Sequence, residues 1–171
     1  MARTIELRRH TANEGDVLTA AGVAAAVAIG RALQGPYALI VSTGAQRATQ
    51  SGACFIAGLG RSVPGGLVVD DGFRSRDEDR WRGIYAKTRK GDIEAFLIAD
   101  YAFVQDEAKR FLTALQRVAM HTPEDGRSMV VGHSPMLEAA VWAATGEMIR
   151  ALGKGKAVVL VHEAGAFALA E

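Results

Sequence analysis

Short apolar runs alternate with longer segments of helical character along the chain. The first run, Ile5 to Leu7, alternates with polar neighbours, whereas Tyr37 to Val41 is a continuous apolar stretch of strand length. Both patterns are typical of β-strands. Further runs occur at 67–69, 129–131, 158–161 and 166–170. Strands separated by helices predict an α/β protein, here a three-layer α/β/α sandwich with a mostly parallel central sheet and helices on both faces.

Local signals set the expected limits of the helices. The segment 16–34 reads as a helix with Thr19 as a plausible N-cap, and Gly35-Pro36 is a strong stop. A second helix is expected at about 45–59. A third should begin at Ser134-Pro135, with proline in its favoured first-turn position. The last two strands are close enough in sequence to form a hairpin.

One stretch, 71–92, shows no clear periodicity. Between Arg74 and Lys90 it holds seven basic and three acidic residues, a local charge of 7 − 3 = +4. An irregular segment of this length is often a functional loop. We therefore predict one domain over residues 1–171 that carries a basic, irregular loop at about 71–92. The loop either recruits an anionic substrate or is simply solvated.

Composition narrows the class of protein. The chain has 171 residues, 49% hydrophobic and 23% charged, which is a globular balance. A net charge of +1 gives no overall field that would gather nucleic acid or a membrane surface. The single cysteine, Cys54, cannot form an internal disulfide. No apolar run approaches the roughly 20 residues that span a bilayer, and no signal peptide is evident, so a cytoplasmic location is expected.

Candidate chemistry gathers where strands end. His10 follows the first strand and His133 the fourth; Arg9 precedes His10, and Arg47 lies in the first turn of the helix after the second strand. The carboxyl ends of parallel strands meet at one edge of a sheet, so these four side chains should converge. Arginine forks suit a phosphoryl group, helix starts at Ala45 and Ser134 would add N–H donors, and a histidine among them can attack phosphorus.

Each of these residues also has an ordinary role when taken alone. His10 would be a histidine at the end of a loop, the arginines solvated charges, and His133 a turn residue. It is their joint placement that favours a site. His121 and His162 have no supporting pattern. Carboxylates are missing from the set and arginines repel cations, so no metal and no cofactor are expected.

The chain resembles the histidine phosphatase superfamily, whose members are also called phosphoglycerate mutase-like proteins. Four of that family's motifs have similar counterparts here, in family order, over positions 5 to 138. They are Leu7-Arg8-Arg9-His10-Thr11, Leu18-Thr19-Ala20-Ala21-Gly22, the stretch 42–51 that reads STGAQRATQS, and Val131-Gly132-His133. The compact branch of the family, which includes bacterial phosphohistidine phosphatases, is the most similar.

The resemblance implies a role for each residue. His10 would be the nucleophile that takes the phosphoryl group, while Arg9, Arg47 and His133 would bind it and stabilise its oxygens. Asn13 lies near a phosphate-contacting position of the family. No metal would be required, since the two arginines and His133 surround the phosphoryl group.

The sequence departs from the family pattern in three ways. Thr11 replaces the usual glycine after the histidine. Aligning Trp81-Arg82-Gly83 with the family's Trp-Glu-Gly puts Ser75 where many members have a glutamate that acts as general acid, and serine donates protons poorly. Asp77 or Glu78 could substitute. The insertion that covers the site in mutases is also absent, so mutase activity is not expected.

Two functions follow from this resemblance. The first is a metal-independent phosphatase that hydrolyses a phosphomonoester or a phosphohistidine through a covalent phosphohistidine on His10. The second is a catalytically impaired pseudophosphatase that only binds a phosphorylated ligand or partner. The expected substrate is a phosphorylated small molecule or a phosphoprotein, with neither nucleic acid nor a membrane as partner, and the oligomeric state is open.

Overall fold

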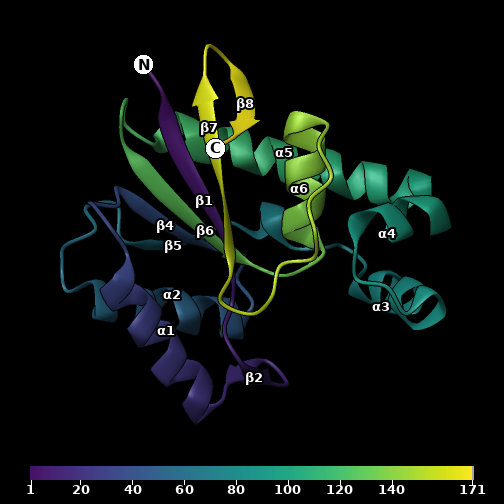
Figure 1. Cartoon of the computed structure of the whole chain (residues 1–171), viewed down its shortest axis with the longest axis horizontal. Coiled ribbons are helices and arrows are strands. Elements are labelled where there is room, and N and C mark those ends of the chain that lie inside the picture. The colour runs from purple at the N-terminus through teal and green to yellow at the C-terminus, as the bar shows by residue number, and fades with distance from the viewer. Residues whose placement is uncertain (171) are drawn as a thin grey trace.

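A six-stranded sheet forms the centre of the computed structural model, which describes residues 1–170 (Figure 1). Four neighbouring strands of this sheet are parallel to one another, and the two strands at one edge are joined to them and to each other by antiparallel pairing. In spatial order they are β5 (Leu67–Val69), β4 (Leu39–Ser42), β6 (Arg127–Gly132), β1 (Arg3–Arg9), β7 (Ala157–Glu163) and β8 (Ala166–Leu169). The predicted, mostly parallel sheet is therefore confirmed, and β7 and β8 form the expected hairpin.

Helices cover both faces of this sheet. Figure 1 shows α1 (Ala20–Ala32) and α2 (Gln46–Leu59) on one side, and α5 (Tyr101–His121) and α6 (Met136–Thr145) on the other. Neighbouring residues of a strand pack alternately against the two helix layers: Ile40 packs with α1 and α2, whereas Val41 packs with α5 and α6. This alternation follows from the two-residue period of a strand. The α/β/α sandwich is the fold that the sequence predicts.

The predicted start of the first helix is wrong by four residues. The chain first forms a small hairpin, β2 (Asn13–Glu14) with β3 (Val17–Leu18), and α1 begins only at Ala20. Thr19 is its N-cap as expected, because its hydroxyl accepts a hydrogen bond from the Gly22 N–H at 3.0 Å. The last helix, α6, also starts late: Pro135 is its N-cap rather than a first-turn residue.

The segment 71–92 is not the irregular loop that the sequence predicts. It contains a short 3-10 turn, η1 (Asp71–Phe73), and the helix α3 (Glu78–Thr88), and α4 (Ile93–Ala99) follows. Helical periodicity is hard to see because α3 buries only Trp81 and Ile84. Its remaining surface is charged, and pairs such as Arg74–Glu78 and Arg82–Asp79 stabilise it.

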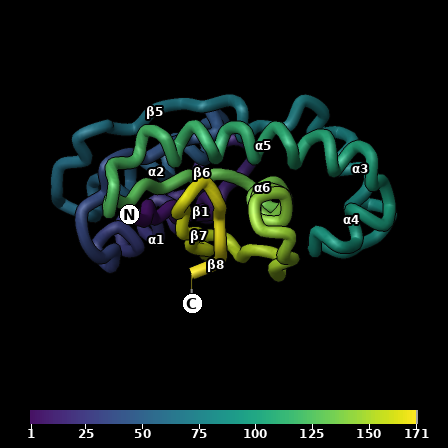
Figure 2. The backbone as a smooth tube through the Cα atoms, turned by 90° about the horizontal axis from the view of Figure 1, so that it is seen from above, coloured from purple at the N-terminus to yellow at the C-terminus, as the bar shows by residue number. Residues whose placement is uncertain are grey.

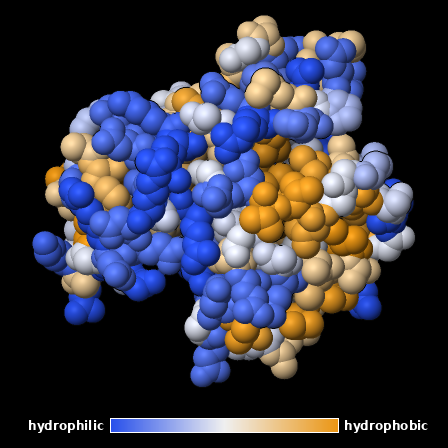
Figure 3. All heavy atoms as spheres, turned by 180° about the vertical axis from the view of Figure 1, so that it is seen from behind, coloured by the Kyte–Doolittle hydropathy of each residue, from blue (hydrophilic) through white to orange (hydrophobic). Residues whose placement is uncertain are grey.

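The helices α3 and α4 form an arm beyond one end of α5 (Figure 2). Seen from behind, the arm presents a mainly hydrophilic surface (Figure 3). Ion pairs offset part of the positive charge of the segment 71–92, since Arg74, Arg80 and Arg82 all contact carboxylates. No helix within residues 1–170 is both long enough and apolar enough to cross a bilayer.

The helices α1 and α2 approach each other closely at two glycines. A Cβ atom at Gly30 would lie 2.3 Å from the Phe55 carbonyl oxygen, and one at Gly58 would lie 2.1 Å from the Val27 carbonyl oxygen. Both obstacles are main-chain atoms, which cannot rotate away as a flexible side chain could. The layer that carries α1 and α2 therefore depends on these positions having no side chain.

We predict that Gly58→Ala lowers the free energy of unfolding by about 1–3 kcal/mol, because the helices must separate to admit the methyl group. Urea denaturation followed by circular dichroism measures the change. Gly83→Ala is the matched control: Gly83 lies inside α3 with nothing within 4 Å of a Cβ atom, and the change should stabilise by up to about 1 kcal/mol. Equal effects of the two substitutions would contradict the importance of close packing at Gly58.

Candidate active site

A cleft of about 910 Å³ opens at the carboxyl ends of the parallel strands. The end of β1 supplies Arg9 and His10, the first turn of α2 supplies Arg47, and the loop after β6 supplies His133. All four predicted site residues thus line one cleft. The parallel register explains this, because Arg9 pairs with Gly132 and Ser42 with Val131, so the three strands end at the same level.

The two histidines lie side by side in the cleft. Their ring centroids are 5.1 Å apart and the rings are tilted by 59°. The Nδ1 atom of His10 lies 2.8 Å from the carbonyl oxygen of its neighbour Thr11. A carbonyl can only accept, so this contact assigns the proton to Nδ1 and leaves a lone pair on Nε2. His10 therefore has a nitrogen that can act as a nucleophile.

Both imidazoles are held in the neutral state. Burial lowers the pKa of His10 to about 4: the Thr11 carbonyl opposes this shift, and the positive charges of Arg47 and Arg9 add to it. Burial also lowers the pKa of His133 to about 3, with further contributions from Arg47 and His10. At neutral pH both rings are therefore uncharged, and the positive charge near them comes from guanidinium groups.

Two buried polar atoms in this group have no hydrogen-bond partner among residues 1–170: Arg9 Nε and His133 Nε2. Arg9 uses another donor, Nη1, to bind the Leu152 carbonyl oxygen at 2.7 Å. On the other side of the His133 ring, Nδ1 lies 3.5 Å from the Thr43 hydroxyl. Buried polar atoms normally have partners, so these two unsatisfied atoms mark a place where a polar ligand fits.

The sequence analysis missed Asp16, which also lines the cleft. Its carboxylate binds Arg47 Nη1 at 2.7 Å and accepts hydrogen bonds from the main-chain N–H groups of Gln46 and Arg47. Burial alone would raise the pKa of Asp16, but these N–H groups and the Arg47 charge outweigh it and lower the pKa. The expectation that the start of α2 offers free N–H donors is therefore wrong for Gln46 and Arg47, whose N–H groups bind Asp16.

Of the remaining candidates, Asn13, Ser75 and Glu78 line the cleft. Asn13 donates from Nδ2 to the Gly15 carbonyl oxygen at 2.8 Å. The Glu78 carboxylate accepts from Arg74 at 3.0 Å and from Arg82 at 3.3 Å. Asp77 does not line the cleft, because its carboxylate caps α3 by accepting from the Arg80 N–H at 3.0 Å. Of these two acidic residues, only Glu78 lies in the cleft lining.

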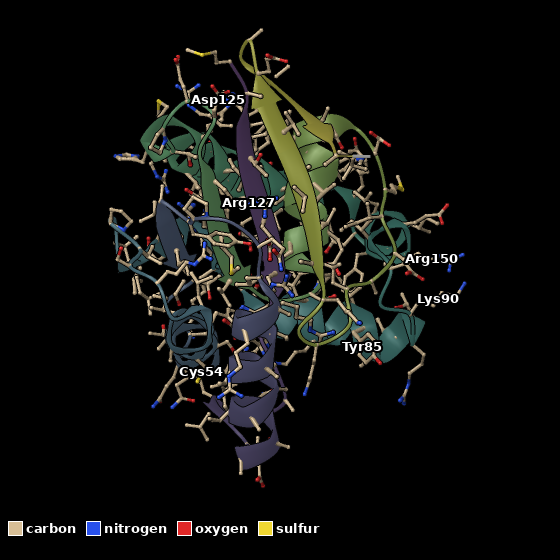
Figure 4. All side chains as sticks on the ribbon, turned by 60° about the vertical axis from the view of Figure 1, so that its left-hand side comes forward. Cys54, Tyr85, Lys90, Asp125, Arg127 and Arg150 are labelled. Atoms are coloured by element: carbon tan, nitrogen blue, oxygen red, sulfur yellow. The ribbon has the colours of Figure 1, made fainter. Side chains whose placement is uncertain are left out.

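The outer part of the cleft combines apolar and basic side chains. Trp81 and Phe96 from the arm and Met136 from α6 lie there with the cations Arg82 and Lys154. On the surface nearby, Figure 4 shows Tyr85 and Lys90 from the arm on the same side of the molecule as Arg150, which lies in the loop after α6. Among residues 1–170 no three metal-ligating side chains of the His, Cys, Asp or Glu type cluster together.

Comparisons with known proteins bear on the fold. No protein-family model and no curated protein sequence matches the chain. Among solved structures, a mycobacterial glucosyl-3-phosphoglycerate phosphatase is 16% identical with a TM-score of 0.71, and the match covers 99% of this chain and 97% of that one. A phosphoserine phosphatase from Entamoeba histolytica, in complex with 3-phosphoglyceric acid, is 14% identical with a TM-score of 0.75, and the match covers 99% of this chain and 95% of that one. A phosphoglycerate mutase from Bacillus anthracis is 13% identical with a TM-score of 0.75, and the match covers 99% of this chain and 92% of that one. The chain therefore has the phosphoglycerate mutase-like fold that the motifs indicate.

We predict that His10 titrates with a pKa of about 4 and His133 with a still lower one, measured from pH 3 to 8 by the ¹⁵N shifts of the imidazoles. The unfolded chain binds these protons near pH 6.5, so the free energy of unfolding should fall as the pH drops from about 6.5 towards 4. His10→Asn should lose less stability over the same range. A His10 midpoint near 6.5 would show that the ring is not held neutral by its surroundings.

Proposed function

We propose that this protein is a phosphatase that transfers a phosphoryl group to Nε2 of His10 and then to water. The observation that supports the proposal most directly is the orientation of His10. Its Nδ1 is engaged by the Thr11 carbonyl, so Nε2 is left for a cleft that also holds Arg9, Arg47 and His133. A neutral imidazole in a fixed tautomer, surrounded by donors, is suited to attack phosphorus.

In the first step the Nε2 lone pair of His10 forms a bond to phosphorus while the bond from phosphorus to the leaving oxygen breaks. Arg9 and Arg47 stabilise the charge on the three remaining oxygens. If the Thr43 hydroxyl donates to Nδ1 of His133, the proton of that ring lies on Nε2 and can be donated to the phosphoryl group. In the second step a water oxygen attacks phosphorus, the bond to Nε2 breaks, and inorganic phosphate leaves.

Proton transfer to the leaving group is assigned to Glu78. It lines the cleft on the arm, whereas the nearby Ser75 hydroxyl is a poor acid. Both Glu78 oxygens accept bonds from arginines, so the carboxylate must first take up a proton from solvent and give up one of those contacts before it can protonate a leaving oxygen. This arrangement favours substrates whose leaving group departs readily, such as the imidazole of a phosphohistidine.

The solved structures support the same class of reaction. Two of those described above are named as phosphatases, for glucosyl-3-phosphoglycerate and for phosphoserine. By analogy, we infer a phosphorylated small molecule or a phosphoprotein as substrate here, with the apolar and basic outer cleft binding the leaving group. Because a mutase shares the fold, we include in the proposal that water, rather than a second hydroxyl of the substrate, accepts the phosphoryl group.

We predict that His10→Ala lowers the hydrolysis of p-nitrophenyl phosphate by roughly 10³-fold or more in the presence of a chelator. The wild type should also form an acid-labile, base-stable phosphoryl adduct that the variant lacks. His121→Ala is the control, since His121 is the last residue of α5, is not part of the cleft lining, and has its Nδ1 2.8 Å from the Arg117 carbonyl oxygen.

Residual activity in His10→Ala equal to that of the wild type would overturn the assignment of the nucleophile. A wild-type protein that binds vanadate but neither hydrolyses the substrate nor forms the adduct would instead be the catalytically impaired phosphate-binding protein, the second function that the family resemblance allows.

We further predict that Glu78→Gln separates substrates by leaving group. The kcat/KM for p-nitrophenyl phosphate should stay within about 3-fold, while that for an alkyl phosphate should fall by about 10²-fold, because only the alkoxide needs a proton donor. Asp77→Asn is the matched control and should change neither value. Equal losses on both substrates would rule out Glu78 as the general acid.

A further inference from the structure

Glu138 is a fully buried acid for which the reaction above gives no role. It lies in the first turn of α6, with 0% of its surface exposed. Its Oε1 atom accepts two short hydrogen bonds, both of 2.6 Å, from the Ser134 hydroxyl and from the main-chain N–H of Leu152. Among residues 1–170 it forms no direct ion pair and its Oε2 atom has no partner. A buried carboxylate of this kind is costly, so its retention calls for a physical reason.

Leu152, whose N–H binds Glu138, also binds a residue of the candidate active site. The carbonyl oxygen of Leu152 accepts the hydrogen bond from Arg9 Nη1 at 2.7 Å. One residue of the loop between α6 and β7 thus lies between the carboxylate of Glu138 and the guanidinium of Arg9. With Nη1 engaged in this way, Arg9 keeps Nε unsatisfied in the cleft wall. The direction in which Arg9 presents that donor therefore depends on where Leu152 lies.

The loop around Leu152 has few other attachments. Its later part is bound to the end of β1, through hydrogen bonds from the Gly155 N–H to the carbonyl oxygens of Arg9 and His10. In its earlier part the Glu147 N–H binds the Thr145 hydroxyl at 3.0 Å, and the Ala151 N–H binds Asp92 at 3.2 Å. Glu138 supplies the shorter bond, and it comes from the rigid core rather than from the arm. The Leu152 side chain packs against the core, as does that of Ile149, and Glu138 adds to this packing a fixed bond to the main chain of Leu152.

Electrostatics agree with this geometry. Burial raises the pKa of Glu138, whereas the bonds from Ser134 and Leu152 and the charge of Arg9 oppose that shift. Burial likewise lowers the pKa of Arg9, and the charge of Glu138 opposes this. Each of the two groups thus favours the charged form of the other, although among residues 1–170 they form no direct ion pair.

We propose that Glu138 is a positioning residue of the phosphate site: by accepting the hydrogen bond from Leu152 N–H it fixes the carbonyl group that orients Arg9 toward the phosphoryl group. The inference rests on the proposed function in one respect, the binding of the phosphoryl group by Arg9. The essential property of Glu138 is then a correctly placed acceptor oxygen and not its charge alone.

Three substitutions separate these properties. Glu138→Gln keeps an acceptor oxygen at the same reach and removes the charge, so the dissociation constant for inorganic phosphate should stay within about 3-fold of the wild-type value. Glu138→Met keeps the volume and removes the acceptor. Glu138→Asp keeps the charge but withdraws the acceptor by one methylene. Both of these should weaken phosphate binding at least 10-fold, about 1.4 kcal/mol, and raise KM for p-nitrophenyl phosphate.

A control variant distinguishes this positioning role from a general loss of stability. Thr122→Val removes a buried hydrogen-bonding hydroxyl near the start of β6, at the opposite end of the sheet, and should destabilise the fold without changing KM. A purely structural role of Glu138 would likewise lower only the folded fraction.

The readout that does not need catalysis is the Nε–H resonance of Arg9 in ¹⁵N spectra, which should be retained in Glu138→Gln and broadened or lost in Glu138→Met and Glu138→Asp. Unchanged phosphate binding and an unchanged resonance in Glu138→Asp would overturn the proposal, even if Glu138→Met does not fold. So would equal losses in Glu138→Gln. If the wild type itself binds no phosphate, the proposed function fails, while the Arg9 resonance still tests the role of Glu138.

Discussion

The parallel pairing of β1 with β6 is the constraint on which the candidate site depends. It aligns Arg9 with Gly132, and the His10 N–H continues the ladder by binding the Gly132 carbonyl oxygen at 3.1 Å. The next residue on each strand is a histidine, so one shared register brings both rings to a centroid distance of 5.1 Å. A shift of the pairing by one residue would send one ring to the other face of the sheet. The relative position of the two histidines is therefore a property of the sheet.

The electrostatic character of the site follows from this placement. Histidines enclosed at the end of a buried sheet lose hydration, and nearby guanidinium groups disfavour a further positive charge, so both rings stay neutral. The arginines keep their charge, and one of them is already engaged: Asp16 binds Arg47 and the start of α2. Under the proposed function, a phosphoryl dianion would compete with this carboxylate for the same guanidinium.

The strands, the sandwich and the convergence of four cleft residues could be predicted from the sequence, because each depends on local patterns: apolar runs, a cap at Thr19, and motifs at strand ends. Contacts between distant segments could not. Glu138 and Leu152 are joined across the loop after α6, Arg9 reaches a carbonyl 143 residues away, and Asp16 binds the start of another helix. The arm was missed for a different reason, since a helix that buries two residues has almost no hydrophobic period.

The adjacent residues Arg8 and Arg9 show how one strand end serves both the structure and the site. Successive side chains of β1 point to opposite faces, so Arg8 lies with the buried Glu6 on the side of α1 and α2, while Arg9 lies toward Glu138 of α6. Each guanidinium is thereby compensated by a buried glutamate, and both hold the same loop, through the carbonyl oxygens of Gly155 and Leu152. They differ in what remains free. The direct contact of Arg8 with Glu6 satisfies its Nε, whereas Glu138 acts on Arg9 only through Leu152 and leaves its Nε unsatisfied. The alternation along β1 places Arg9 in the cleft lining, and only the arrangement around Arg9 keeps a charged donor for a ligand there.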